Sequence, residues 1–329
     1  MKRVNVLVTS AIGDECLRLI NAVDGANVQD GSGLLRSELE GDNVARAKFD
    51  ASLSEAEIVY GLRLPQDVIK KAPNLKWVQV MSAGVERFLD ADMRESQVVL
   101  TNVSGIHAIP ISEFVIGLML MFVKESSASM DLKQKRKWER ISPVVLANKT
   151  VGIVGLGSIG QQVARLAKAF GMKVVATRRT AREGDRARNV DAVFPPSRLR
   201  DLLSESDFVV LSVPFTAETN MLMGENELRS MKRSARLINI ARGGIVDEQA
   251  LVKALREGWI AGAGLDVFAT EPLPVDSPLW TLPNVFVSPH VSGTREDYVL
   301  AATRLFVDNL HRYLAGKRLR NVVNKARGY

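Results

Sequence analysis

The sequence predicts an α/β protein with two domains, each built on a doubly wound parallel sheet with covering helices. Two observations support this fold class. The chain has 329 residues, a length typical of about two domains. Short apolar runs alternate with helical patterns through both halves of the chain, and in the second half these runs are continuous. Continuous apolar runs are typical of parallel strands that are buried on both faces.

The first half, residues 1 to about 99, predicts a small parallel sheet. Residues 4–8, 58–60 and 77–81 have the pattern of strands, and residues 14–22 and 64–71 have the pattern of helices. Gly, Asp and Ser residues between positions 24 and 43 indicate loops.

The second half begins with a long predicted helix. We expect Ser112 to be its N-cap, with Pro110 just outside it. A final helix is predicted over residues 294–315, where apolar residues recur at the spacing of one helix face. Between these helices six runs predict strands, at residues 150–154, 173–177, 208–213, 237–241, 263–267 and 285–288.

Composition excludes several classes of protein. The single cysteine, Cys16, cannot build a disulfide or a thiolate metal site within one chain, so we expect a reducing, cytoplasmic setting and no metal. The net charge of +7 is modest and suits an anionic substrate and cofactor better than a nucleic acid. The longest apolar run, residues 114–123, is shorter than the ~20 residues that span a bilayer, and the N-terminus lacks a signal-peptide pattern. We therefore expect no membrane or nucleic-acid partner.

A glycine-rich loop follows the first strand of the second series. The sequence Gly155-Leu-Gly157-Ser-Ile-Gly160 ends a strand and opens an amphipathic helix, which is the context of a dinucleotide-binding fingerprint. The first glycine permits a tight turn, the second lets the backbone approach a pyrophosphate, and the third lets helix and strand pack closely. Phosphates would bind the backbone N–H groups at the helix N-terminus, including those of Ser158 and Ile159. A glycine turn without a ligand is the less favoured alternative.

The end of the next strand predicts the type of dinucleotide. NAD-binding versions carry an acid about 20 residues after the loop, which binds the ribose 2′-hydroxyl. Here Arg178, Arg179 and Thr180 stand there instead. Because a guanidinium can bind a phosphate bidentately, we expect NADP to be preferred, with NAD as the alternative. The sequence leaves open which arginine makes the contact, and purely solvated arginines are the other interpretation.

Three polar residues follow strands of the same predicted sheet. Arg242 comes after residues 237–241, Glu271 after 263–267, and His290 after 285–288. Ligands of open parallel sheets bind beyond the carboxyl ends of the strands. We therefore expect these three side chains to converge beside a nicotinamide.

The chemistry of a 2-oxo acid reduction needs these residue types. The carbonyl carbon receives a hydride and its oxygen a proton, which an imidazole such as His290 can donate near neutral pH. Glu271 would orient that imidazole and favour its charged form. Arg242 would bind the substrate carboxylate and polarise the carbonyl. An ordinary structural ion pair is the alternative for Arg242 and Glu271.

At these residues the sequence resembles the D-isomer-specific 2-hydroxyacid dehydrogenase family, and the likeness covers nearly the whole chain. It rests on residues 155–160, 239–244, 263–268 with 271–274, and 288–293. The resemblance implies hydride transfer between NADP(H) and a small 2-oxo or 2-hydroxy acid of D configuration. It also implies that Asp266 contacts the nicotinamide carboxamide and that Pro214 lies by the adenosine. The other cofactor-binding residues that the resemblance implies are Val213, Thr219, Ala241 and Gly293. For the substrate it implies Arg242, His290, Ala83 and Gly84, and the N–H groups of the last two would bind the substrate carboxylate.

The resemblance also implies an architecture. Residues 1–99 and 293–329 would form a flavodoxin-like substrate domain, and residues 100–292 a Rossmann-type dinucleotide-binding domain, with the site in an interdomain cleft. Members of the family are typically homodimers. We expect the long helix after residue 111 and the basic segment to Trp138 to lie in that interface.

Departures from the family pattern narrow the function. Glu271 stands where formate dehydrogenases carry Gln, and the chain ends at Tyr329, before the regulatory domain of many phosphoglycerate dehydrogenases. The arginines after the second strand resemble those of glyoxylate/hydroxypyruvate reductases, so this reduction is the favoured function. The alternatives are a dehydrogenase for a larger 2-oxo acid or phosphite, and a nucleotide-sensing, corepressor-like binding protein. Arg63 would either bind a second substrate anion or face water.

Overall fold

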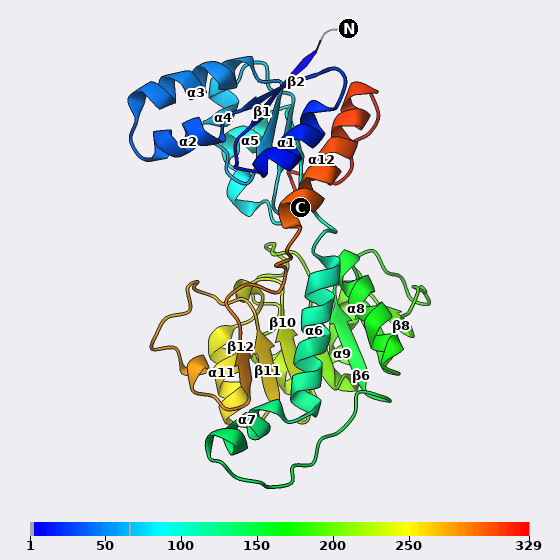
Figure 1. Cartoon of the computed structure of the whole chain (residues 1–329). Helices are drawn as coiled ribbons and strands as arrows, with labels where there is room; N and C mark the ends of the chain where they lie inside the picture. The colour runs from blue at the N-terminus through cyan, green and yellow to red at the C-terminus, as the bar shows by residue number, and fades with distance from the viewer. Residues whose placement is uncertain (1–2, 66, 329) are drawn as a thin grey trace. The chain divides into compact units, whose positions relative to one another are not determined.

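The chain folds into two compact units (Figure 1). The computed structural model describes residues 3–65 and 67–328. Unit 1 consists of Met1–Ile106 and Arg295–Tyr329, and unit 2 is His107–Thr294. The chain therefore changes units after residues 106 and 294, whereas the sequence suggested 99 and 292. The first border lies later because residues 99–101 form a strand that pairs within unit 1.

Unit 1 contains a five-stranded parallel sheet with the order β2-β1-β3-β4-β5. The predicted strands at residues 4–8, 58–60 and 77–81 are present, and two more flank them. Residues 24–43 are not only loops, because they contain β2 and helix α2, so that expectation was wrong. The strands are β1 (Val4–Val8), β2 (Ala26–Asp30), β3 (Ile58–Gly61), β4 (Trp77–Val80) and β5 (Val99–Thr101).

Helices cover both faces of the unit 1 sheet. One core contains residues of α1 and α12, and the other contains residues of α2 to α5. The α12 helix comes from the far end of the chain and packs beside α1. Its Phe306 ring stacks on Tyr60, with ring centroids 4.2 Å apart, and on Trp77 at 5.2 Å. The helices are α1 (Gly13–Asn21), α2 (Ser32–Leu39), α3 (Asn43–Glu55), α4 (Val68–Lys71), α5 (Ala91–Glu95) and α12 (Tyr298–Leu314), with a 3-10 turn at Glu86–Phe88.

Unit 2 contains a seven-stranded parallel sheet with the order β12-β11-β10-β9-β6-β7-β8. All six predicted strands are present, and β8 is added at one edge. The order reverses beside β6, which is the switch point where doubly wound sheets bind ligands. The strands are β6 (Thr150–Val154), β7 (Lys173–Thr177), β8 (Ala192–Phe194), β9 (Phe208–Leu211), β10 (Arg236–Asn239), β11 (Gly262–Leu265) and β12 (Val285–Val287).

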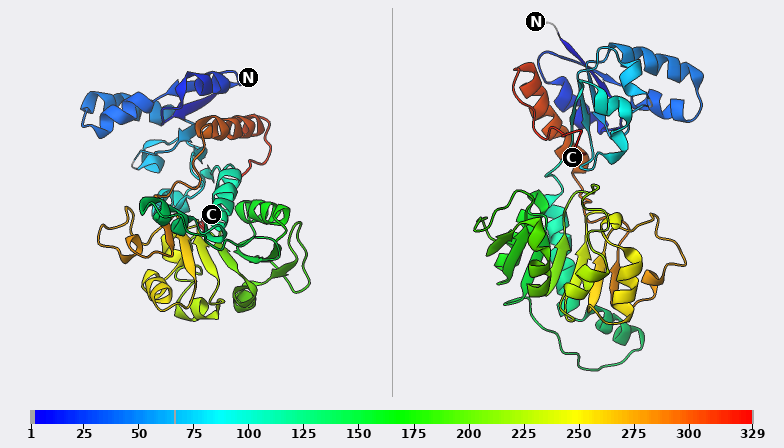
Figure 2. Two further views of the ribbon diagram at one scale, coloured as in Figure 1. Left: turned by 60° about the horizontal axis from the view of Figure 1, so that its bottom comes forward. Right: turned by 180° about the vertical axis from the view of Figure 1, so that it is seen from behind.

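Helices also cover both faces of the unit 2 sheet (Figure 2). Residues of α6 and α8 line one core, and residues of α9, α10 and α11 line the other. The helices are α6 (Ala108–Val123), α7 (Ser126–Gln134), α8 (Ser158–Ala169), α9 (Leu199–Glu205), α10 (Glu225–Ser230) and α11 (Glu248–Arg256), with 3-10 turns at Pro196–Arg198, Gly243–Ile245 and Pro278–Trp280. No helix in the described part of the chain is long and apolar enough to cross a membrane.

The long helix α6 begins earlier than the sequence suggested. Its first residue is Ala108, so Ser112 lies inside the helix rather than at its N-cap. The Ser112 hydroxyl donates to the carbonyl of Ile109. Pro110 falls in the first turn, where a missing N–H costs nothing because no intrahelical acceptor exists for it.

Candidate active site

The glycine-rich loop joins β6 to α8 at the switch point of the unit 2 sheet. Gly155 has a φ of +101°, and a Cβ there would lie 2.7 Å from Val213 Cγ1 and 2.9 Å from the Ser212 carbonyl oxygen. A Cβ at Gly160 would lie 2.4 Å from the Gly155 oxygen. Only glycine fits these two positions, so the loop folds tightly between β6 and the segment after β9.

The N-terminus of α8 is open. Gly157 is its N-cap, and no side chain there caps the helix. A Cβ at Gly157 would meet nothing within 4 Å. The first N–H groups of the helix, which include those of Ser158 and Ile159, have no intrahelical acceptor. The loop therefore has the room and the polarity to take a pyrophosphate.

The end of β7 carries the arginines that the sequence singled out. Arg178 Nη2 lies 3.1 Å from Asp185 Oδ2, and its buried Nε has no hydrogen-bond partner among the described residues. Arg179 and Thr180 are exposed. The N–H of Arg182 also donates to Asp185, which together with the Arg178 guanidinium lowers the pKa of that carboxyl. Sequence reasoning missed Asp185, because an acid seven residues after Arg178 has no motif of its own.

The segment after β9 lies against the glycine loop. Ser212 Oγ donates to the Gly155 oxygen at 2.7 Å, and Val213 is half-buried beside Gly155. Pro214 is exposed, and its carbonyl accepts a 2.7 Å hydrogen bond from Thr219 Oγ1. Three residues expected at the cofactor, Val213, Pro214 and Thr219, therefore belong to one internally bonded segment next to the loop.

The strands β10, β11 and β12 bring the catalytic candidates to one edge of the sheet. Asn239, Leu265 and Val287 are aligned across these neighbouring strands. Arg242 and His290 each lie three residues beyond this row, and Glu271 lies six residues beyond it. Their loops leave the same carboxyl edge of the sheet, as the sequence pattern suggested.

The loop that carries Arg242 contacts the loop that carries Glu271. A Cβ at Gly243 would lie 1.9 Å from the carbonyl carbon of Phe268, so the two backbones touch. Buried Asn239 donates to the Arg242 carbonyl and accepts from the N–H of Ala241. The half-buried guanidinium of Arg242 donates to the carbonyl of Ala241, which is itself buried, at 2.7 Å.

Glu271 and His290 are in direct contact. Glu271 Oε2 lies 2.8 Å from His290 Nδ1, and its Oε1 accepts a 3.0 Å hydrogen bond from the Phe268 N–H. The His290 side chain is 49% exposed. Its backbone is left-handed, with a φ of +55°. The carboxylate therefore fixes one ring nitrogen and leaves the imidazole open to a ligand.

Asp266 contacts the loop that carries His290. It is fully buried, and its two oxygens accept from Ser288 Oγ at 2.6 Å, from Val291 N at 2.9 Å and from Ser292 N at 3.0 Å. Gly293 follows in the same loop, where a Cβ would lie 2.9 Å from Cδ2 of His107. No sequence motif indicated these contacts of Asp266.

The expected substrate loop lies in unit 1, after β4. The carbonyl of Gly84 accepts from Ser82 Oγ, and that of Ala83 accepts from Asn102 Nδ2. Among residues 3–65 and 67–328, the N–H groups of Ala83 and Gly84 have no acceptor. The Arg63 side chain is exposed. Two neighbouring N–H groups are thus available to an anion.

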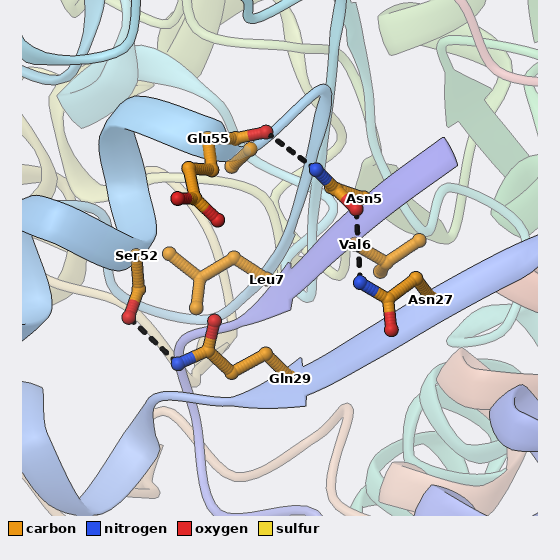
Figure 3. Close-up of a pocket in the computed structure, with 8 residues that line it drawn as sticks. Asn5, Val6, Leu7, Asn27, Gln29, Ser52 and Glu55 are labelled. Atoms are coloured by element: carbon orange, nitrogen blue, oxygen red, sulfur yellow. Dashed lines mark hydrogen bonds between the residues drawn. The ribbon is translucent and has the colours of Figure 1, made fainter. Parts of the chain in front are cut away.

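A small recess in unit 1 is a different feature (Figure 3). Its volume of about 20 Å³ holds about one water molecule, so neither a dinucleotide nor an oxo acid fits there. Asn5 accepts from Asn27 and donates to the carbonyl of Glu55 at its rim. Within the described residues, no group of three or more His, Cys, Asp or Glu side chains could hold a metal ion.

A glycine-rich turn at the switch point of a parallel sheet, with an imidazole–carboxylate pair at the edge of the same sheet, is typical of a nicotinamide-dependent oxidoreductase. A family model described as D-isomer specific 2-hydroxyacid dehydrogenase, NAD binding domain, matches residues 116–292. The chain belongs to the D-isomer specific 2-hydroxyacid dehydrogenase family, and its fold and enzyme class are those that the sequence predicted.

Relatives support this membership. A glyoxylate reductase from Aeropyrum pernix is 34% identical over 99% of this chain and 97% of its own. A D-3-phosphoglycerate dehydrogenase from Methanocaldococcus jannaschii is 32% identical over 98% of this chain, which spans only 59% of that relative. A crystal structure of an NADPH-dependent glyoxylate/hydroxypyruvate reductase from Sinorhizobium meliloti, in complex with NADP and sulfate, has a TM-score of 0.83 and 29% identity over 99% of this chain and all of that one.

Proposed function

We propose that the protein reduces glyoxylate, hydroxypyruvate or a similar small 2-oxo acid with NADPH, and that a chiral product has the D configuration. The observation that carries this proposal is the 2.8 Å contact between Glu271 and His290, beside the loop of Arg242. The names of the Aeropyrum and Sinorhizobium relatives support the choice of substrate. Acid–base catalysis by a positioned imidazole is the chemistry that a carbonyl reduction needs.

In the proposed reaction each side chain has one task. A bound nicotinamide would supply the hydride that the carbonyl carbon receives. Glu271 holds Nδ1 of His290, so Nε2 is the nitrogen that donates a proton to the carbonyl oxygen. Arg242 binds the substrate carboxylate and polarises the carbonyl. We propose that the N–H groups of Ala83 and Gly84 also bind the substrate carboxylate.

The residues after β7 fit NADP better than NAD. No carboxylate occupies the end of the strand, and Asp185 is already paired with Arg178. The Asp185 contact restrains the Arg178 guanidinium, and Arg179 and Thr180 are exposed beside it. A 2′-phosphate bound there would therefore lie beside the guanidinium groups of Arg178 and Arg179 and the hydroxyl group of Thr180. NADPH dependence of the Sinorhizobium relative supports this preference.

We also propose that the protein is a homodimer. Large apolar side chains are exposed on α6, on α7 and on the segment after it. They are Ile109, Met121, Met130 and Trp138, the last of which has no covered surface. A second copy of the chain would bury them. Light scattering should give twice the 36.1 kDa mass of the chain, and a monomer in Trp138→Ser would support this face as the interface.

One experiment tests the function. NADPH absorbance is followed with a panel of 2-oxo acids for the wild type and for His290→Ala. We expect turnover in the wild type and its collapse by about 100-fold or more in His290→Ala, since general acid catalysis contributes about that much, with NADPH binding nearly unchanged. The matched control is His311→Ala, on the exposed side of α12. NADPH binding without turnover of any acid would favour a nucleotide-sensing protein instead.

A further inference from the structure

We propose that Asn102 is a positioning residue that aims the N–H groups of the substrate loop at the substrate carboxylate. This inference rests on the proposed function and deepens it. Asn102 comes directly after β5, and the substrate loop, residues 82–85, follows the neighbouring strand β4. The Asn102 side chain is buried, and its Nδ2 donates to the Ala83 carbonyl at 2.8 Å. Its Oδ1 accepts from the Ser104 N–H at 3.0 Å, so the nitrogen and the oxygen of the amide are both bonded.

Hydrogen bonds hold the carbonyl groups of this loop. The Ser82 carbonyl accepts from the Val103 N–H at 3.2 Å, and the Gly84 carbonyl accepts from Ser82 Oγ at 2.7 Å. Asn102 holds the carbonyl between them. The loop peptides are trans, and in a trans peptide the C=O and N–H groups point in opposite directions. The N–H of Ala83 therefore points away from Val103, and the N–H of Gly84 points away from the Asn102 amide.

These two N–H groups are open to a ligand. Within residues 3–65 and 67–328 they have no acceptor, and Ala83 is exposed while Gly84 is half-buried. Successive backbone N–H groups in a turn can form an anion-binding concavity. Because the carbonyl ends of both peptides are bonded, the donors are oriented before a carboxylate arrives, and less ordering is needed when it binds.

The direction of the Gly84 N–H depends on one side chain. In the described part of the chain, Asn102 is the only donor to the Ala83 carbonyl, which belongs to the same peptide as that N–H. Without this bond the peptide could rotate, and its N–H would no longer be fixed toward a carboxylate. We therefore infer that the Asn102 amide acts on the substrate through the Ala83–Gly84 peptide.

The C-terminal segment holds Asn102 in turn. The backbone N–H of Asn102 donates to the Asn321 carbonyl at 3.3 Å. Asn321 Nδ2 donates to the carbonyls of Asn102, at 3.3 Å, and Ser104, at 2.7 Å. Val322 forms an antiparallel bridge with Thr101, the last residue of β5. The segment after α12 therefore supports the substrate loop through Asn102.

Asn102→Ser separates the contact with the loop from the turn after β5. The shorter hydroxyl can still accept from the Ser104 N–H, as serine does in such turns. It ends one bond earlier than Nδ2, so it cannot reach the Ala83 carbonyl. Asn102→Asp would be a poorer test, because the added charge would itself repel a carboxylate.

NMR observes the Gly84 N–H directly and needs no turnover. Labelling alanine carbonyls with ¹³C and glycine nitrogens with ¹⁵N selects Ala–Gly peptides, and the Gly84 signal is the one that Ala83→Ser lacks. The probe is oxalate, a carboxylate that cannot accept a hydride, added in the presence of NADP⁺. We expect oxalate to shift the Gly84 signal in the wild type and to bind about 10-fold more weakly in Asn102→Ser, the effect of about one charge-assisted hydrogen bond. The sequence has four such peptides, at residues 83–84, 261–262, 263–264 and 315–316.

Steady-state kinetics separates positioning from a general loss of structure. In Asn102→Ser we expect KM for glyoxylate to rise about 10-fold, with kcat and Kd for NADPH within about threefold, because the lost interaction binds the carboxylate rather than the reacting carbonyl. Asn321→Ala removes two bonds to the turn of Asn102 and should raise KM by a smaller factor. It also keeps the test decisive if Asn102→Ser fails to fold. The control is Asn324→Ala, an exposed residue of the same segment, which should leave KM and the Gly84 signal unchanged.

Three outcomes would overturn the proposal. In the first, oxalate leaves the Gly84 signal of the wild type unshifted. In the second, Asn102→Ser and Asn321→Ala both keep the wild-type affinity for oxalate. In the third, kcat and NADPH affinity fall as much as KM rises, which would show a general structural role. A failure of the proposed function is distinct from these, because wild-type protein that reduces no 2-oxo acid would still show the dependence of oxalate binding on Asn102.

Discussion

Oε2 of Glu271 lies 2.8 Å from Nδ1 of His290, across the loops that follow two neighbouring strands. The other oxygen of Glu271 accepts from the Phe268 N–H, so the carboxylate is fixed before it meets the imidazole. A carboxylate in this position holds Nδ1 and orients the ring, which leaves Nε2 as the nitrogen for proton transfer.

Glu271→Gln therefore removes the negative charge beside the imidazole and keeps the shape of the side chain. The amide oxygen can still accept from the Phe268 N–H, but the NH₂ group would donate to Nδ1, whereas the carboxylate can only accept there. We expect kcat to fall about 100-fold, within the range of general acid catalysis. Because the glutamate is half-exposed, the change should leave the melting temperature nearly unaltered. The measurement is steady-state NADPH oxidation with saturating glyoxylate. Wild-type kcat in Glu271→Gln would contradict the assigned role.

Arg178 and Arg179 should determine cofactor preference. Removing one charge-assisted hydrogen bond to a phosphate costs about 1.5–3 kcal/mol, or about 10- to 100-fold in affinity. We expect Arg179→Ala and Arg178→Ala to raise KM for NADPH by about that factor and to leave KM for NADH unchanged. Comparing kcat/KM for the two cofactors measures the effect. Arg200→Ala, an exposed arginine of α9, is the control, and an equal loss with NADH would refute contact with the 2′-phosphate.

Two glycines of the same loop should respond differently to alanine. A Cβ at Gly160 would lie 2.4 Å from the Gly155 oxygen, whereas one at Gly157 would meet no atom within 4 Å. Overpacking costs about 1–3 kcal/mol, so Gly160→Ala should lower the melting temperature by several degrees. Gly157→Ala should leave it unchanged and still weaken NADPH binding, because the methyl group would occupy the space of the pyrophosphate. A normal NADPH affinity in Gly157→Ala would argue against phosphate binding there.

Asp191 should make unit 2 less stable in acid. Its burial opposes ionisation, but hydrogen bonds from Lys168 and from the Val174 N–H outweigh burial and lower its pKa. The carboxyl of an unfolded chain titrates near ~3.9, so the stabilisation is present above that pH and is lost as the pH falls through the lower folded pKa. We expect Asp191→Asn to lower the melting temperature at pH 7, and we expect this effect to vanish as the pH falls through the lowered folded pKa of Asp191. A pH-independent difference would contradict this account.

Sequence patterns predicted much of the fold because buried parallel strands leave continuous apolar runs. The strands they missed lie at sheet edges. The β2 strand, Ala26–Asp30, is mostly exposed and polar, and β5 and β8 have only three residues each. The start of α6 was missed because Pro110 was taken as a helix boundary although the first turn tolerates proline.

The sequence predicted which strand ends carry the residues of the candidate site. Arg242, Glu271 and His290 could be found because each follows an apolar run. The hydrogen bonds of Asp266 could not be predicted, because they depend on the left-handed backbone of His290. No sequence feature at position 290 indicates that conformation. The pairing of Arg178 with Asp185 likewise depends on the turn at Arg182 rather than on any spacing rule.

In the sequence, unit 2 is inserted between the two segments of unit 1, and this order has a consequence for biosynthesis. As the polypeptide leaves the ribosome, residues 107–294 are complete before α12 exists. The rings of Tyr60 and Trp77 lack their stacking partner until Phe306 has been synthesised. Domains fold as units during synthesis, so the nucleotide-binding half forms first. Unit 1 therefore lacks the stacking of Phe306 on Tyr60 and Trp77 until α12 has been synthesised.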